Sequence, residues 1–82
     1  MIRTVLIIDG MACTMCEAHV NDAIRKAVAG TKKLSSSYRK GESSFLTEEA
    51  PDLNALRAEI EKTGYRVLSA ESEPYVKKGL FG

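Results

Sequence analysis

The chain has 82 residues, 44% of them hydrophobic and 28% charged, which predicts one small globular domain with a single thin core. Twelve Lys and Arg residues balance eleven Asp and Glu residues, for a net charge of +1. Because no basic excess gathers along the chain, we expect no nucleic-acid partner.

The first predicted element is a strand over residues 2–8, where β-branched and aliphatic residues dominate until Asp9-Gly10 ends the run. This apolar run is too short for a membrane span or for a signal peptide with a cleavage site. The two cysteines are too few and too close together for a disulfide scaffold. We therefore predict a cytoplasmic protein without a membrane span, in which the thiols stay reduced.

The second predicted element is a helix over residues 16–28, because apolar residues recur there at three- and four-residue steps. Thr14 is the expected N-cap, which would place Glu17 at the N3 position of a capping box. Glu17 would also lie near the positive end of the helix dipole. Gly30 is expected to end this helix.

Residues 31–39 and 42–49 are predicted to form a hairpin around a turn at Lys40-Gly41. The first of these strands is weak by composition, because a run of three serines is poor in β-forming residues. On that strand Leu34, Ser36 and Tyr38 would share one face.

A second helix follows, with Pro51 expected in its first turn and Thr63-Gly64 at its end. A last strand over residues 65–70 completes the order β-α-β-β-α-β. This is the ferredoxin-like α+β fold, in which two helices pack on one face of a four-stranded antiparallel sheet. Residues 1–73 are predicted to form this domain. Residues 74–82 would be a C-terminal tail, either a frayed terminus, a strand extension or a partner-docking segment.

Cys13 and Cys16 lie between the first strand and the first helix, which is where we expect chemistry. A surface loop leaves the sulfur atoms accessible, and the helix N-terminus favours thiolate over thiol. The two-residue spacer lets both sulfur atoms converge on one point. Two thiolates suit a soft ion of low coordination number, which favours Cu(I), although Ag(I) and Hg(II) also fit. Zn(II) prefers four ligands, so it would need water or a partner to complete its coordination.

The segment Gly10-Met11-Ala12-Cys13-Thr14-Met15-Cys16 resembles the G-M-x-C-x-x-C motif of the heavy-metal-associated domain family. This family includes small copper chaperones and the N-terminal metal-binding domains of copper-transporting P-type ATPases. The likeness covers residues 2–72 in element order and includes Thr63-Gly64-Tyr65.

The resemblance implies that Cys13 and Cys16 bind the metal. It also implies that Met11 packs under the loop and shapes it, and that Tyr65 lies near the site. Zinc- and cadmium-exporting relatives often have an acidic residue where this chain has Ala12, so the resemblance favours copper. His19, one turn after Cys16, would be either a third metal ligand or a helix histidine without a metal role.

The function predicted from these residues is that of a non-enzymatic Cu(I) chaperone or buffer that passes the ion on by ligand exchange. The resemblance implies a copper-transporting P-type ATPase or another metal-binding domain as partner. A homodimer that shares one ion is left open. One alternative is a dithiol oxidoreductase, because a C-x-x-C pair that opens a helix also occurs in thioredoxin-like proteins. The other is a protein-interaction module that retains the metal motif, with the C-terminal tail as its support.

Overall fold

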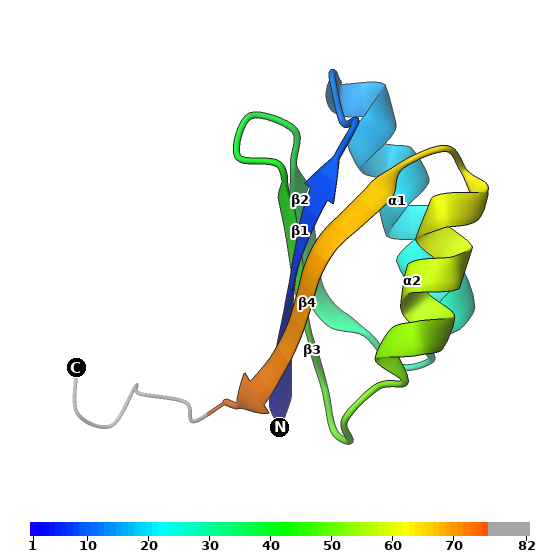
Figure 1. Ribbon diagram of the computed structural model, residues 1–82. Coiled ribbons are helices and arrows are strands. Elements are labelled where there is room, and N and C mark those ends of the chain that lie inside the picture. The colour runs from blue at the N-terminus through cyan, green and yellow to red at the C-terminus, as the bar shows by residue number, and fades with distance from the viewer. Residues whose placement is uncertain (76–82) are drawn as a thin grey trace, which may run out of the picture.

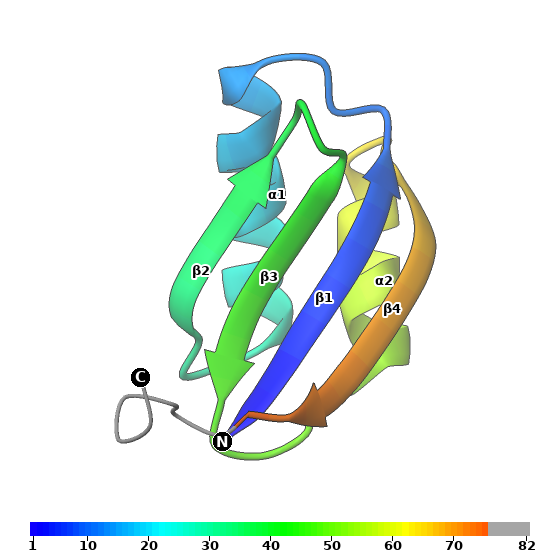
Figure 2. The ribbon, with the colours of Figure 1, turned by 90° about the vertical axis from the view of Figure 1, so that its left-hand side faces the viewer.

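The computed structural model describes residues 1–75 and contains two helices on one face of a four-stranded antiparallel sheet (Figure 1). The strands follow the spatial order β2-β3-β1-β4 (Figure 2). The elements are β1 (Ile2–Asp9), α1 (Thr14–Ala27), β2 (Lys32–Ser37), β3 (Glu42–Thr47), α2 (Leu53–Lys62) and β4 (Arg66–Pro74). The predicted ferredoxin-like α+β fold is therefore confirmed.

The central strand β1 alternates between its two faces. Thr4, Leu6 and Ile8 are buried at 0%, 0% and 3% exposure. The residues between them are half-buried or exposed. This period of two is what a strand covered by helices on one side requires.

Strand β4 is longer than predicted, because it continues to Pro74, which pairs with Ile2 of β1. The backbone N–H of Tyr75 then donates to the carbonyl oxygen of Met1 at 2.8 Å. The first residues of the predicted tail thus continue the sheet, and residues 76–82 lie outside the described part of the chain.

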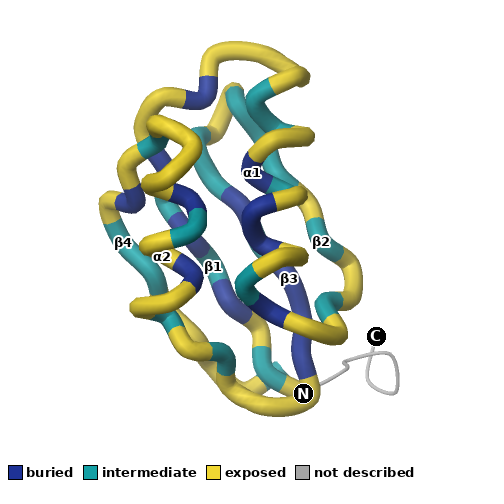
Figure 3. The backbone as a smooth tube through the Cα atoms, turned by 90° about the vertical axis from the view of Figure 1, so that its right-hand side faces the viewer, coloured by how far each residue is buried: buried dark blue, intermediate teal, exposed yellow. Residues whose placement is uncertain are grey.

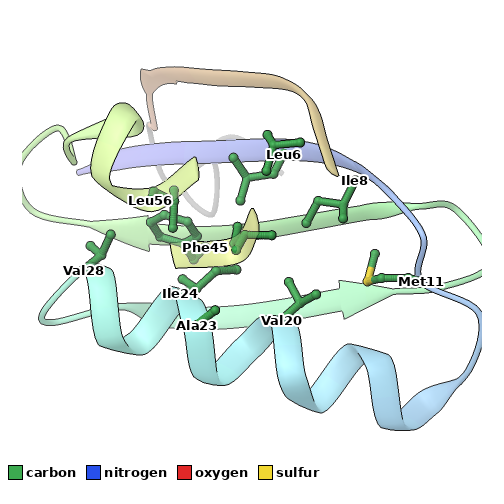
Figure 4. Close-up of a cluster of buried hydrophobic side chains, with 11 residues drawn as sticks. Leu6, Ile8, Met11, Val20, Ala23, Ile24, Val28, Phe45 and Leu56 are labelled. Atoms are coloured by element: carbon green, nitrogen blue, oxygen red, sulfur yellow. The ribbon is translucent and has the colours of Figure 1, made fainter. Parts of the chain in front are cut away.

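The core lies between the sheet and the two helices (Figure 4). Phe45 of β3 is 1% exposed and Leu56 of α2 is 0% exposed. The outward surfaces of both helices are largely exposed (Figure 3). Eleven buried apolar residues form this cluster: Leu6, Ile8, Met11, Val20, Ala23, Ile24, Val28, Phe45, Leu56, Ile60 and Val67.

The serines of β2 have structural partners despite their low strand propensity. Ser36 Oγ donates to Asn21 Oδ1 of α1 at 2.5 Å and lies 2.7 Å from Ser43 Oγ of β3. Because Ser43 is 1% exposed, this contact satisfies a hydroxyl group that has no access to water. Leu34 and Tyr38 pack against the core from the same strand and turn. Side-chain hydrogen bonds therefore stabilise β2 in place of the packing of β-branched side chains that is common in strands.

The predicted N-terminus of α1 is wrong in detail. The helix begins at Thr14, and its N-cap is Cys13, which makes no side-chain capping hydrogen bond. Glu17 is consequently too far along the helix for a capping box, and its Oε2 accepts a hydrogen bond from Tyr38 N at 2.9 Å. The carboxylate of Glu17 is therefore bound by a backbone N–H of the β2–β3 turn. A capping motif, which considers only neighbouring residues, cannot predict this long-range contact.

The start of α2 also differs from the prediction. Asp52 is the N-cap, and its Oδ1 accepts from Asn54 N at 3.0 Å and from Ala55 N at 3.2 Å. Pro51 therefore precedes the cap and lies outside the first turn. Aspartate is a favoured N-cap residue, since its short carboxylate reaches the free N–H groups of the first turn.

Neither helix of residues 1–75 has the length and apolar character that a membrane crossing requires.

Candidate metal centre

The two cysteines lie at one end of the molecule, where β1 passes into α1 through a short loop (Figure 1). Cys13 is exposed and Cys16 is half-buried, and both thiols are free. Their Sγ atoms are 3.6 Å apart. The two sulfur atoms can therefore contact one ion at the surface, as the two-residue spacer predicted.

The surroundings of Cys16 stabilise its thiolate. The backbone N–H of Ala12, the hydroxyl of Tyr65 and the side chain of Cys13, in decreasing order of effect, lower the pKa of Cys16 from 9.0 to about 7. These groups donate hydrogen bonds to sulfur and so favour its charged form. The lowered pKa therefore favours the thiolate form of Cys16 near neutral pH.

Tyr65 comes from a distant part of the chain, just before β4, and is half-buried beside Cys16. The hydrogen bond that its hydroxyl donates to Cys16 raises the pKa of Tyr65 to about 12, because deprotonation would break that bond. The ring also packs on Gly10, where an added Cβ would lie 3.3 Å from Tyr65 Cδ1. Gly10 has φ +106°, so both its conformation and this contact favour glycine.

Met11 lies at the start of the loop but belongs to the core cluster, with 9% of its surface exposed (Figure 4). Its thioether is packed among apolar side chains, which holds the loop against the sheet and helices. Met15, in contrast, is 68% exposed. Of these two methionines, Met11 is therefore the one packed into the core.

His19 is exposed on α1, and its Nδ1 lies 3.4 Å from Tyr65 Oη. Within residues 1–75 no three Cys, His, Asp or Glu side chains come together as a metal-binding group. The donors that the structure brings together are therefore the two cysteine sulfurs.

Sequence reasoning missed two contributions to this site. The hydrogen bond from Ala12 N–H leaves no pattern in the sequence. Almost every residue has a backbone N–H, and only the folded structure decides whether it points at the sulfur atom of Cys16. The bond from Glu17 to the β2–β3 turn joins residues 21 positions apart. Charge and spacing within α1 gave no indication of that partner.

Most of the chain resembles a small part of known mercuric reductases. It is 36% identical over 67 residues to mercuric reductase from Staphylococcus aureus, a match that covers 82% of this chain and 12% of that protein. The enzyme from Serratia marcescens is 35% identical over 79 residues, covering 95% of this chain and 17% of that protein. The chain thus spans less than a fifth of the length of either relative. No family model matches the chain.

Solved structures of metal-binding proteins share the fold. The CopZ metallochaperone superimposes with a TM-score of 0.69 at 22% identity, covering 80% of this chain and 98% of that chain. The yeast copper transporter domain Ccc2a gives the same TM-score and identity and covers 90% of this chain and 97% of that chain. A copper-binding domain from a P-type ATPase gives a TM-score of 0.62 at 23% identity, covering 90% of this chain and 96% of that chain.

Proposed function

We propose that this chain belongs to the heavy-metal-associated domain family, which its fold and motif resemble, and that it binds one soft metal ion through the thiolates of Cys13 and Cys16. The observation that carries this proposal is the pair of free thiols, one exposed and one half-buried, with sulfur atoms 3.6 Å apart. Met11 would support the loop from below, and Tyr65 would hold the thiolate of Cys16 by its hydroxyl group.

Cu(I) is the ion that this donor set suits best. Thiolates select soft ions, and two-coordinate binding needs no third protein ligand. Two thiolates with Cu(I) carry a net charge of −1, which the N–H groups at the start of α1 help to offset. The copper-binding domain and the copper transporter domain among the structural neighbours support the same choice. Zn(II) would bind more weakly here, because it prefers four ligands.

His19 stays a prediction as an additional ligand. Its Nδ1 faces the hydroxyl of Tyr65 at 3.4 Å, so a metal ion bound through Nδ1 would displace that contact. We therefore assign the ion to the two sulfur atoms and place His19 beside Tyr65.

The role that follows is that of a Cu(I) chaperone or buffer, and no catalytic step is required of it. A partner's thiolate would attack the two-coordinate ion, form a three-coordinate intermediate and displace one cysteine at a time. A copper-transporting P-type ATPase or another metal-binding domain would be the acceptor, in a compartment where thiols stay reduced. Two copies of this chain sharing one ion would use the same exchange chemistry.

Hg(II) is the second candidate cargo, and the mercuric reductases among the sequence relatives favour it. Hg(II) also suits two thiolates and would use the same pair of cysteines. A dithiol oxidoreductase has less support. Thioredoxin-like proteins place a cis-proline against their cysteine pair, whereas no peptide bond in the described residues is cis.

Anaerobic titration of the reduced protein with Cu(I) against bathocuproine disulfonate tests the proposal. We expect one equivalent to bind, with binding lost in the Cys13→Ser, Cys16→Ser double variant. Met15→Leu is the matched control, because this exposed thioether sits within the motif and should be dispensable. Binding that persists in the double variant would refute the site. A parallel titration with Hg(II) against a competing thiol ranks the two cargoes.

A further inference from the structure

The metal loop between β1 and α1 has two fixed ends, and both are fixed to the same neighbour. That neighbour is the turn between β2 and β3, residues Tyr38–Gly41, which lies at the same end of the molecule as the loop (Figure 2). The start of the loop is bound there through the backbone, and its far side is bound through a side chain of α1.

At the start of the loop, Ile8 N donates to Gly41 O at 2.7 Å. This bond continues the β1–β3 pairing, whose last pair is Ile7 with Glu42, into the turn itself. The contact is close, because a Cβ added at Gly41 would lie 3.2 Å from Ile8 O. The turn therefore supports the start of the metal loop from one side, while β4 pairs with the last residue of β1 on the other side.

On the other side of the loop, the first turn of α1 lacks a side-chain cap. Its N-cap, Cys13, provides no side-chain capping bond. The backbone closes the turn, because Cys16 N donates to Cys13 O at 3.0 Å, whereas the bond from Glu17 N to the same oxygen is longer, at 3.4 Å. The start of α2, in contrast, is also held by two bonds to the carboxylate of Asp52. The turn of helix that carries Cys16 therefore lacks the side-chain support that α2 has, and a contact from outside the helix takes its place.

Glu17 provides such a contact. Its Oε2 accepts from Tyr38 N at 2.9 Å, and Glu17 and Tyr38 are both half-buried, so water competes weakly for this bond. Tyr38 is itself anchored, because its side chain packs against the core and Arg39 lies 5.6 Å above its ring. The first turn of α1 is thereby tied to a rigid part of the sheet.

We infer that Glu17 is a positioning residue for metal binding, which fixes the separation of the two sulfur atoms by tying the first turn of α1 to the β2–β3 turn. This inference rests on the proposed function. The two ends of the metal loop then share one rigid support, so the sulfur atoms are held close together before an ion arrives. Binding an ion to a preorganised pair costs the loop less conformational entropy, so the ion binds more tightly.

Two variants separate the hydrogen bond from the charge of the carboxylate. Glu17→Gln keeps an acceptor oxygen at the same distance from the backbone and removes the charge. Glu17→Asp keeps the charge, but is one methylene too short to reach Tyr38 N. Glu48→Asp is the matched control, because Glu48 pairs with Lys32 at 3.8 Å and follows Thr47, which pairs with Ile2 at the opposite end of β1.

The affinity for Cu(I) is measured by competition with bathocuproine disulfonate. We expect Glu17→Asp to weaken binding roughly fivefold to tenfold, a change typical of losing one intramolecular hydrogen bond. Glu17→Gln and Glu48→Asp should stay within about twofold of the parent protein. Unchanged affinity in Glu17→Asp would overturn the inference. So would equal weakening in Glu17→Gln, because the effect would then come from charge.

Hydrogen exchange on the metal-free protein tests the anchoring independently of any ion. The amide of Tyr38 should exchange about tenfold faster in Glu17→Asp than in the parent protein or in Glu17→Gln. Equal exchange rates in all three proteins would overturn the inference even if the affinities differ. A parent protein that binds no Cu(I) would instead refute the proposed function, while the exchange rates still decide whether Glu17 anchors the helix.

Discussion

The hydroxyl of Tyr65 is the side-chain group that most strongly favours the thiolate of Cys16, so its removal has a measurable consequence. The pKa of Cys16 is about 7 instead of 9.0, and Tyr65 is the second cause of this shift after the N–H of Ala12. Tyr65→Phe removes one oxygen atom and leaves the ring packed on Gly10. We therefore expect the pKa of Cys16 to rise to a value between 7 and 9.0 in this variant.

The size of the effect follows from the two ends of that range. A thiol with a pKa of 7 is about half ionised at pH 7, one with a pKa of 8 about one tenth, and one with a pKa of 9 about one hundredth. Because the thiolate is the species that reacts, alkylation of Cys16 at pH 7 should slow several-fold in Tyr65→Phe. The shift cannot be complete, since the N–H of Ala12 remains in place.

The assay measures the rate of iodoacetamide alkylation from pH 5.5 to 9.5 in a Cys13→Ala background, so that only Cys16 reacts. Tyr65→Phe is compared with the Cys13→Ala protein itself, because the side chain of Cys13 also lowers the pKa of Cys16. Tyr38→Phe is the matched control, because it removes the hydroxyl of a tyrosine that is not among the groups that lower the pKa of Cys16. A midpoint that stays the same in Tyr65→Phe would refute the proposed hydrogen bond. An equal rise in Tyr38→Phe would do so as well, because the effect would then not be specific to the site.

The same ionisation links stability to pH in the metal-free protein. The pKa of Cys16 is lower in the folded protein than the ordinary value of 9.0, so folding favours the thiolate. This contribution is complete above pH 9.0 and is lost as the pH falls through about 7. Chemical denaturation of the reduced protein should therefore show stability rising between these values. The slope should be smaller in Tyr65→Phe.

Three further substitutions test the fold that supports the site, each by chemical denaturation of the metal-free protein. Phe45→Ala should cost about 3–5 kcal/mol of unfolding free energy, because it empties the centre of the core; a loss below about 1 kcal/mol would show that the core collapses around the gap. Asp52→Ala should cost about 1 kcal/mol through loss of the α2 cap, whereas Asp52→Asn should recover most of it. Ser36→Ala should cost about 1–3 kcal/mol, because the buried hydroxyl of Ser43 loses its partner; a second substitution, Ser43→Ala, should then cost less in the Ser36→Ala background than in the parent protein.

Local sequence was sufficient for the order of the elements and for the cysteine pair. Apolar residues repeat with the period of a helix in α1 and crowd together in β1, and both patterns reflect short-range geometry. The predicted boundaries moved by a few residues where sequence-distant pairing extended an element, as in β4, which β1 holds as far as Pro74. The predicted capping box at the start of α1 was wrong for a similar reason. Glu17 accepts its hydrogen bond from Tyr38 N on the β2–β3 turn, so its partner lies outside the helix.

Residue identities alone determined that this small domain carries two neighbouring thiols at the junction of a strand and a helix, because chain connectivity fixes that junction. Tertiary structure decided how those thiols behave. The hydroxyl of Tyr65 reaches Cys16 only because β4 pairs beside β1, and Met11 is buried only because the loop folds over the core. Periodicity along the chain reports which face of an element is apolar. The direction of one hydroxyl or N–H group depends on segments that meet only after folding.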